Sequence, residues 1–158
     1  MRTVSVSRRA KVPAAAVIDA LWNGAEWRAS WGSITRFDIE YDDGEHQTAR
    51  LHVDWNGEQR SLSLARFRES ADTIAFFCPS APPPLSRQSG TWSAESLPDG
   101  SLVTATRCLD IAPLPNETEA DRAARFDAYE AALRDRLGQI LENFSARLAA
   151  DHAARVVS

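Results

Sequence analysis

The chain has 158 residues, of which 44% are apolar and 25% charged, a balance typical of one folded domain of ordinary size. Its net charge of −4 argues against a nucleic-acid-binding protein, which would carry a basic stripe. Cys78 and Cys108 form no CxxC motif, and His46, His52 and His152 are scattered. These spacings argue against a disulfide scaffold and against a metal site.

No segment has the length and apolarity of a membrane span or a targeting signal, so we expect a cytoplasmic protein with reduced thiols. The motifs G-x-S-x-G, P-loop and G-x-G-x-x-G are also missing, which leaves hydrolase, NTPase and dinucleotide-binding functions without support. All basic residues except Lys11 are arginine. A buried cation in this protein would therefore be a guanidinium.

The N-terminal region is predicted to be a strand followed by two short helices. Residues 3–12 alternate between polar and apolar side chains, as in a strand. Pro13 then favours the first turn of a helix over 14–22. A second helix over about 25–31 places Trp27 and Trp31 on one side, because they are four residues apart.

From Gly32 to residue 111 the pattern has period two and predicts six antiparallel strands. Three dipeptides typical of hairpin turns separate strands: Asp43-Gly44, Asn56-Gly57 and Asp99-Gly100. The prolines at 82–84 interrupt strand pairing and predict a loop.

A long helix of roughly 30 residues is predicted to follow the sheet, on the order of 45 Å in length. Thr118 and Asp121 have the spacing of a capping box at its start. One apolar stripe runs along it: Phe126, Tyr129, Leu133, Leu137, Ile140, Phe144 and Leu148. This helix can cover one face of the sheet, so we expect an α+β fold in which a curved antiparallel sheet of about seven strands wraps on the helix and leaves a space between them.

This element order resembles that of the helix-grip superfamily (START/Bet v 1-like, SRPBCC). The short segments VPAAAV at 12–17, LW at 21–22 and EW at 26–27 add to the resemblance. The resemblance covers nearly the whole chain, so residues 1–158 are expected to form a single START/polyketide cyclase-like domain. Within the superfamily it is similar to the single-domain polyketide aromatase/cyclases of the tetracenomycin type. That likeness implies aldol cyclisation and dehydration of a poly-β-ketone in the interior cavity, without metal or organic cofactor. It also implies an acyl carrier protein as a partner.

The resemblance carries over to three positions. Trp27 matches a cavity tryptophan of those enzymes, Arg66 matches their central catalytic arginine, and Arg107 falls where the tetracenomycin enzyme has a cavity glutamine. The chain departs from the pattern at Ile34, where a catalytic tyrosine is expected. Tyr41 lies seven residues further along and is not a simple substitute for it.

Strand phase singles out the same two arginines without any family argument. On its strand, Arg66 shares a face with Leu62 and Leu64, and Arg107 shares a face with Val103, Ala105, Leu109 and Ile111. A buried guanidinium stays charged and needs acceptors or a ligand. It can stabilise an enolate. Alternatively, Arg66 can form a salt bridge with an acid such as Asp54 or Glu130, or it can reach water at a strand end.

Aromatic side chains complete the candidate site. Trp27, Trp31, Trp55 and Trp92 suit the walls of a pocket for a flat ligand, and Ile34, Leu64 and Phe76 are further candidate binding residues. Tyr129 is a candidate proton shuttle on the helix stripe, with Tyr41 and water as alternatives, or else a core residue.

We therefore predict a cofactor-independent polyketide aromatase/cyclase-like enzyme, with Arg66, Arg107 and Tyr129 as its catalytic residues. The alternative is a non-catalytic binding, carrier or self-resistance protein for a hydrophobic aromatic natural product. A stress-response or co-chaperone-like member of the superfamily is a third possibility, without support from an exposed apolar segment.

Overall fold

The computed structural model describes residues 1–157, except for the side chains of Ala25 and Trp55. It contains one sheet of seven strands: β1 (Arg2–Ala10), β2 (Ile34–Asp42), β3 (His46–Trp55), β4 (Glu58–Ser70), β5 (Thr73–Phe77), β6 (Leu85–Leu97) and β7 (Gly100–Ile111). Their order across the sheet is β1-β7-β6-β5-β4-β3-β2, and all neighbours are antiparallel. The predicted antiparallel sheet is confirmed, with β1 and β2 as its edges.

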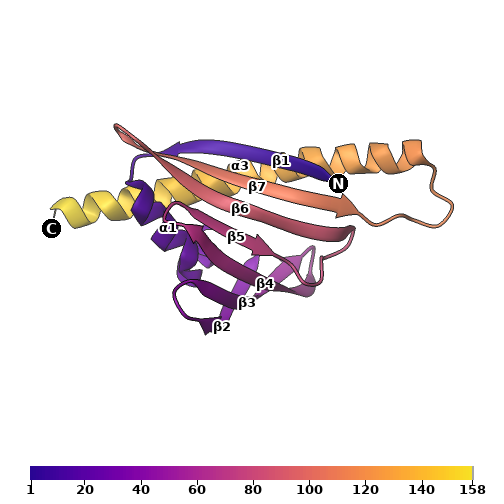
Figure 1. Cartoon of the computed structure of the whole chain (residues 1–158), viewed down its shortest axis with the longest axis horizontal. Helices are drawn as coiled ribbons and strands as arrows, with labels where there is room; N and C mark the ends of the chain where they lie inside the picture. The colour runs from indigo at the N-terminus through magenta and orange to yellow at the C-terminus, as the bar shows by residue number, and fades with distance from the viewer. Residues whose placement is uncertain (158) are drawn as a thin grey trace.

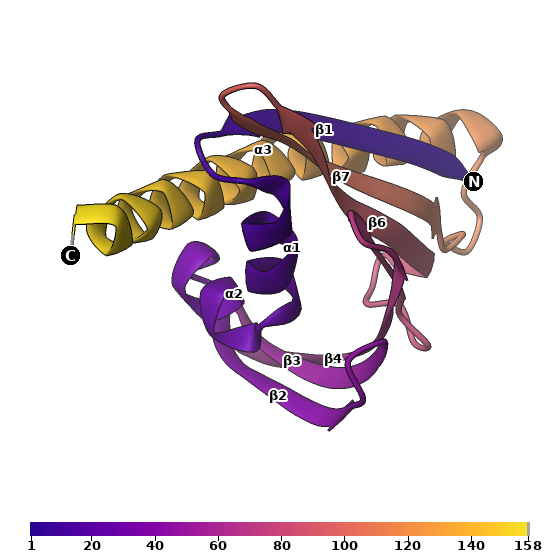
Figure 2. The same cartoon turned by 60° about the vertical axis from the view of Figure 1, so that its left-hand side comes forward.

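Three helices accompany this sheet. The short helices α1 (Ala14–Trp22) and α2 (Gly24–Ser30) connect β1 to β2, and α3 (Glu119–Val157) ends the chain. Figure 1 shows α3 running along the length of the sheet. In Figure 2 the sheet curves so that α1 and α2 lie between β2–β4 and α3. No helix among the described residues is long and apolar enough to cross a membrane.

Asn56 and Gly57 form the tight turn between β3 and β4. Both have positive φ, 53° and 83°, as a two-residue hairpin turn of type I′ requires, and this is why an Asn-Gly pair predicts it. The turn sets which residues of β3 and β4 face each other, and so which side chains of β4 point to the concave face.

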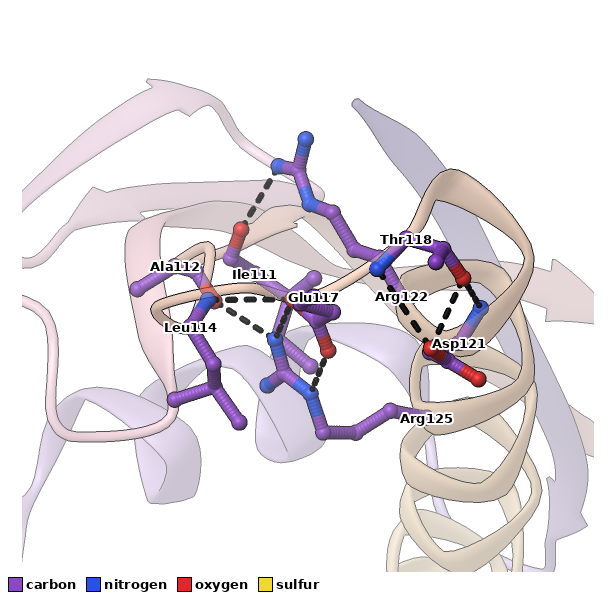
Figure 3. A network of polar contacts seen from close by, with 8 residues as sticks. All are labelled: Ile111, Ala112, Leu114, Glu117, Thr118, Asp121, Arg122 and Arg125. Carbon is purple, nitrogen blue, oxygen red and sulfur yellow. Dashed lines mark hydrogen bonds and ion pairs between the residues drawn. The ribbon is translucent and has the colours of Figure 1, made fainter.

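The start of α3 is held by two groups of polar contacts (Figure 3). The Thr118 hydroxyl accepts a hydrogen bond from the Asp121 backbone N–H at 3.1 Å, and the Asp121 carboxylate accepts one from the Thr118 backbone N–H at 3.4 Å. This is the predicted capping box. Beside it, Arg125 donates to Glu117 at 2.7 Å and 2.9 Å and to the Ala112 carbonyl at 2.7 Å, joining α3 to the chain that leaves β7.

At 39 residues, α3 is longer than the roughly 30 expected. No glycine or proline follows Gly138, so the sequence offers no stop signal, and the helix continues beyond the last residue of its apolar stripe. The core lies between the concave face of the sheet and the inner sides of the helices. Every second residue of β7 points into it, including Arg107 among apolar neighbours.

Candidate functional site

Five residues of the central strands lie in one row across the concave face. The strand register pairs Gln47 with Arg66, Arg66 with Phe76, Phe76 with Gly90, and Gly90 with Arg107. Paired residues in an antiparallel sheet project to the same side. The row therefore brings both predicted arginines to the same side of the sheet, although they are far apart in the sequence.

A cavity of about 90 Å³ lies over this row, between the concave face, α2 and α3. Its lining combines aromatic and aliphatic side chains with guanidinium groups, and none of its described lining residues is Asp or Glu: Trp27, Trp31, Phe37, Leu51, Leu62, Leu64, Arg66, Phe76, Cys78, Gln88, Trp92, Arg107, Leu133, Arg136, Leu137 and Ile140. A mostly apolar space with a few convergent polar groups is the usual character of a ligand site.

Arg107 is a buried cation of this cavity that has few hydrogen-bond partners. The residue is 6% exposed, and among the described residues its one hydrogen bond runs from Nη1 to the Thr106 carbonyl at 2.9 Å. Its guanidinium carbon lies 4.6 Å from the centre of the Phe76 ring and 4.5 Å from that of Trp92. Burial lowers the pKa of Arg107 to about 9, so the group keeps its charge at neutral pH.

Arg66 also lines the cavity, but its three nitrogens have partners within the protein. Nη1 donates to the Leu21 carbonyl at 2.8 Å, Nη2 to the Trp22 carbonyl at 2.6 Å, and Nε to the side-chain oxygen of Gln47 at 2.9 Å. Leu21 and Trp22 are the last residues of α1, and the final carbonyls of a helix lack partners within it. Arg66 thus binds the C-terminus of α1 and forms neither of the salt bridges considered from the sequence, those with Asp54 and Glu130.

Further polar contacts hold this helix end in place. Gln47 donates to the Trp22 carbonyl and to Asp42, both at 3.2 Å, and the Trp22 indole N–H donates to the same carboxylate. The pKa of Asp42 is lowered, chiefly by the backbone N–H of Gly44, and that of Arg66 falls to about 10 because of burial, partly offset by Asp42. The cluster anchors α1 on β3 and β4, and with it one wall of the cavity.

The predicted tryptophans differ in their placement. Trp27 and Trp92 meet edge to face in the cavity wall with ring centres 4.7 Å apart, and Trp27 is fixed by a 2.8 Å hydrogen bond from its indole N–H to the Leu21 carbonyl. Trp31 is partly exposed and lines the cavity near α3. The side chain of Trp55 lies outside the described residues.

A second cavity of about 110 Å³ adjoins the first and shares Trp31, Leu62, Gln88 and Arg136 with it. Tyr129 and the three prolines at 82–84 line this outer cavity. The predicted proton shuttle is therefore placed in the outer space, while both candidate arginines line the inner one.

Two candidates from the second strand lie away from the inner cavity. Ile34 is buried and paired with Val53, and it does not line either cavity in the described part of the chain. Tyr41 is 55% exposed, and its hydroxyl donates to Asp43 at 3.0 Å. The structure thus corrects the suggestion that Tyr41 could transfer a proton in the cavity. Leu64 and Phe76 do line it, as the alternation of their strands predicts.

Arg136 and Gln88 line the inner cavity but were not predicted, although the sequence contains a signal for each. Arg136 lies seven residues after Tyr129 and next to Leu137, so it interrupts the apolar stripe of α3 with a charge. Gln88 has the same strand phase as the buried Trp92. Cys78 also lines the inner cavity, and burial raises the pKa of its thiol to about 11, with Arg107 acting in the opposite direction.

The architecture is the helix-grip fold, and comparison with solved structures shows the same fold in other proteins. StfQ, a di-domain aromatase/cyclase from the steffimycin biosynthetic pathway, has a TM-score of 0.81 and 16% identity over 96% of this chain. This chain spans about half, 52%, of StfQ. The Streptomyces aromatase/cyclase ZhuI has a TM-score of 0.71 and 20% identity, covering 90% of this chain and 93% of its own.

The fold also occurs in structures whose descriptions name no activity. One is a protein from Thermus thermophilus, with a TM-score of 0.78 and 14% identity over 95% of this chain and 99% of its own. No protein-family model matches the chain, and no curated protein sequence does either. The likeness is therefore one of fold, and the argument for function depends on the side chains in the cavity.

Proposed function

We propose that this protein is a polyketide aromatase/cyclase-like enzyme that binds a poly-β-ketone or aromatic polyketide intermediate in its inner cavity and directs aldol cyclisation and dehydration. The observation that carries the proposal is the buried Arg107 guanidinium, which faces an aromatic-walled cavity and has one hydrogen bond to the described residues. The fold shared with StfQ and ZhuI supports it.

In this mechanism Arg107 stabilises negative charge on oxygen. A ketone oxygen of the ligand accepts hydrogen bonds from the guanidinium, which favours removal of a proton from the adjacent carbon because the resulting enolate oxygen is held by a positive charge. The enolate carbon attacks a second carbonyl carbon, and the alkoxide formed there takes up a proton. Loss of water and enolisation then give the aromatic ring. These steps move protons without net oxidation, so the reaction calls for no redox cofactor.

The walls of the inner cavity orient the ligand. Trp27 and Trp92 form a rigid aromatic corner, and flat conjugated ligands gain binding free energy against such surfaces. Arg66 acts as a positioning residue, because its hydrogen bonds fix the helix end to which Trp27 is also bonded. Water or Tyr129 transfers the proton, with Tyr129 acting from the outer cavity, where an acyl carrier protein would deliver the chain.

A second candidate function is favoured by the residue types that the described lining of the two cavities does not include. Ile34 replaces the expected tyrosine and is packed in the sheet, and no carboxylate belongs to the described lining of either cavity. A cavity without a positioned base suits a protein that only carries or sequesters an aromatic natural product.

One experiment separates the two functions. The protein is added to a minimal polyketide synthase with its acyl carrier protein, and the products are resolved by liquid chromatography and mass spectrometry. An enzyme redirects the product profile, and Arg107→Met loses that effect while keeping its circular dichroism spectrum. A carrier leaves the profile unchanged, yet its tryptophan fluorescence is quenched saturably by the aromatic product. An unchanged profile with the wild-type protein would refute the cyclase proposal.

A further inference from the structure

The inner cavity has an excess of positive charge. Arg66, Arg107 and Arg136 line it, Arg60 lines the outer cavity, and the described lining of both spaces contains no carboxylate. Arg66 is held by the end of α1, and Arg60 has Glu58 at 3.2 Å. Arg136 lowers the pKa of Arg107 further by repulsion. The charge of Arg107 is therefore not balanced by an acidic residue of the cavity.

A buried cation without a counterion is costly for a folded protein, by several kcal/mol. Arginine has five N–H donors, and the one hydrogen bond of Arg107 leaves most of them without an acceptor among the described residues. The rings of Phe76 and Trp92 attract its charge but offer no lone pair comparable to that of an oxygen. The remaining N–H donors of Arg107 are therefore suited to an anion that fits a guanidinium.

A glycine lets the Phe76 ring lie close to the sheet beside Arg107. Gly90 lies between Phe76 and Arg107 in the row across the sheet. A Cβ atom at Gly90 would come within 3.0 Å of the Phe76 ring and would also meet the backbone carbonyl of Thr106. The missing side chain thus makes room for the Phe76 ring, and a planar group can approach the guanidinium from the cavity that Phe76, Trp92 and Arg107 line together.

We propose that the natural ligand is a planar aromatic carboxylate whose carboxylate group binds Arg107 and whose ring packs on Trp27 and Trp92. A carboxylate matches the guanidinium fork in geometry and in charge. This inference rests on the second candidate of the proposed function, a carrier of an aromatic natural product in the same cavity, and it adds the charge of the ligand, with a carboxylate on Arg107 in place of a ketone oxygen.

The test compares two probes of nearly equal shape, 2-naphthoate and its neutral amide, 2-naphthamide, by isothermal titration calorimetry at neutral pH. The wild-type protein is expected to bind the carboxylate at least about tenfold more tightly, as a charge-assisted hydrogen bond implies. Arg107→Met removes that preference and leaves the affinity for the amide nearly unchanged. Arg107→Gln does the same and serves as a second variant if the first does not fold. Arg87→Met, which removes an exposed arginine of β6, is the matched control and keeps the preference.

Equal affinity of the wild-type protein for both probes overturns the inference, as does a preference that survives in Arg107→Met or no binding of either probe. Equal affinity still leaves a cavity that binds aromatic molecules, so the proposed function stands in that case. Conversely, a carboxylate preference together with an unchanged polyketide product profile supports the inference while refuting the cyclase reaction.

Discussion

Replacing Arg66 by methionine tests whether this residue holds the helix end or contacts the ligand. The substitution keeps an unbranched side chain of similar length but removes three hydrogen bonds. A hydrogen bond to a charged group contributes about 1.5–3 kcal/mol. Two features make the net loss of stability smaller than the sum over the three hydrogen bonds. Trp27 still donates to the Leu21 carbonyl and Gln47 to the Trp22 carbonyl, and removing a buried charge restores part of its desolvation free energy.

The net loss in the free energy of unfolding should therefore be about 2–4 kcal/mol, a large part of the 5–15 kcal/mol typical of a domain. With a urea m-value of about 2 kcal/mol/M, the midpoint falls by about 1–2 M. Arg68→Met is the matched control, because Arg68 has the same strand phase but is partly exposed and contacts the Trp22 ring and Asp19. Its loss should stay below about 1 kcal/mol.

Arg107→Met provides the contrast. Arg107 has one hydrogen bond and two ring contacts to lose, and its removal also relieves the burial of an unpaired charge, so the stability should change by less than about 1.5 kcal/mol. For ligand binding the order should be reversed: Arg107→Met should lower the affinity more than Arg66→Met does. An Arg66→Met protein with an unchanged urea midpoint and no ligand binding would refute this division of roles and assign Arg66 to the ligand.

Three further predictions concern the thiols, the start of α3 and the glycine of the central row. In a Cys108→Ser protein, Cys78 should react with iodoacetamide slowly at pH 8 and roughly tenfold faster per pH unit up to its pKa of about 11; an aromatic ligand should protect it, and fast reaction at pH 8 would contradict its burial. Glu117 has its pKa lowered to about 2, chiefly by Arg125, so its stabilising contribution is complete above its ordinary pKa of 4.5 and is lost as the pH falls toward 2. Glu117→Gln should lower the melting temperature at pH 6 and converge with the wild type near pH 2, and parallel curves would exclude the ion pair as the cause. Gly90→Ala should destabilise the protein by about 1–3 kcal/mol in urea unfolding, because a Cβ there meets backbone and a packed ring; wild-type stability would contradict the tight packing.

The sequence predicted the elements well because their signals are local. The Asn56-Gly57 turn and the Thr118–Asp121 capping box each depend on residues no more than three positions apart, and strand alternation needs only neighbours. These signals also gave the inward direction of Arg66 and Arg107, since one face of the sheet had to be buried.

The partners of these arginines could not be predicted in the same way. Arg66 donates hydrogen bonds to the carbonyls of Leu21 and Trp22, more than forty residues earlier in the chain. The pattern of side chains in a sequence does not show which backbone carbonyls will accept such bonds. From the sequence an acidic side chain is the expected partner of Arg66, whereas in the structure the partner is the C-terminal end of α1. The register that aligns Arg66, Phe76, Gly90 and Arg107 in one row depends on how several hairpins add together, so it too required the structure.

That row explains why two arginines on the same face differ in what they can do. The side chain of Arg66 on β4 reaches the C-terminus of α1, a helix terminus whose partial negative charge it can neutralise. β7 faces α3 at a point where the helix presents Leu133, Leu137 and Arg136 to the cavity, so Arg107 meets apolar groups and another cation. The fold itself supplies acceptors for the first guanidinium and few for the second. An oxygen-bearing ligand in the cavity would supply what Arg107 lacks, and substitutions at Arg107 should therefore affect binding more than folding.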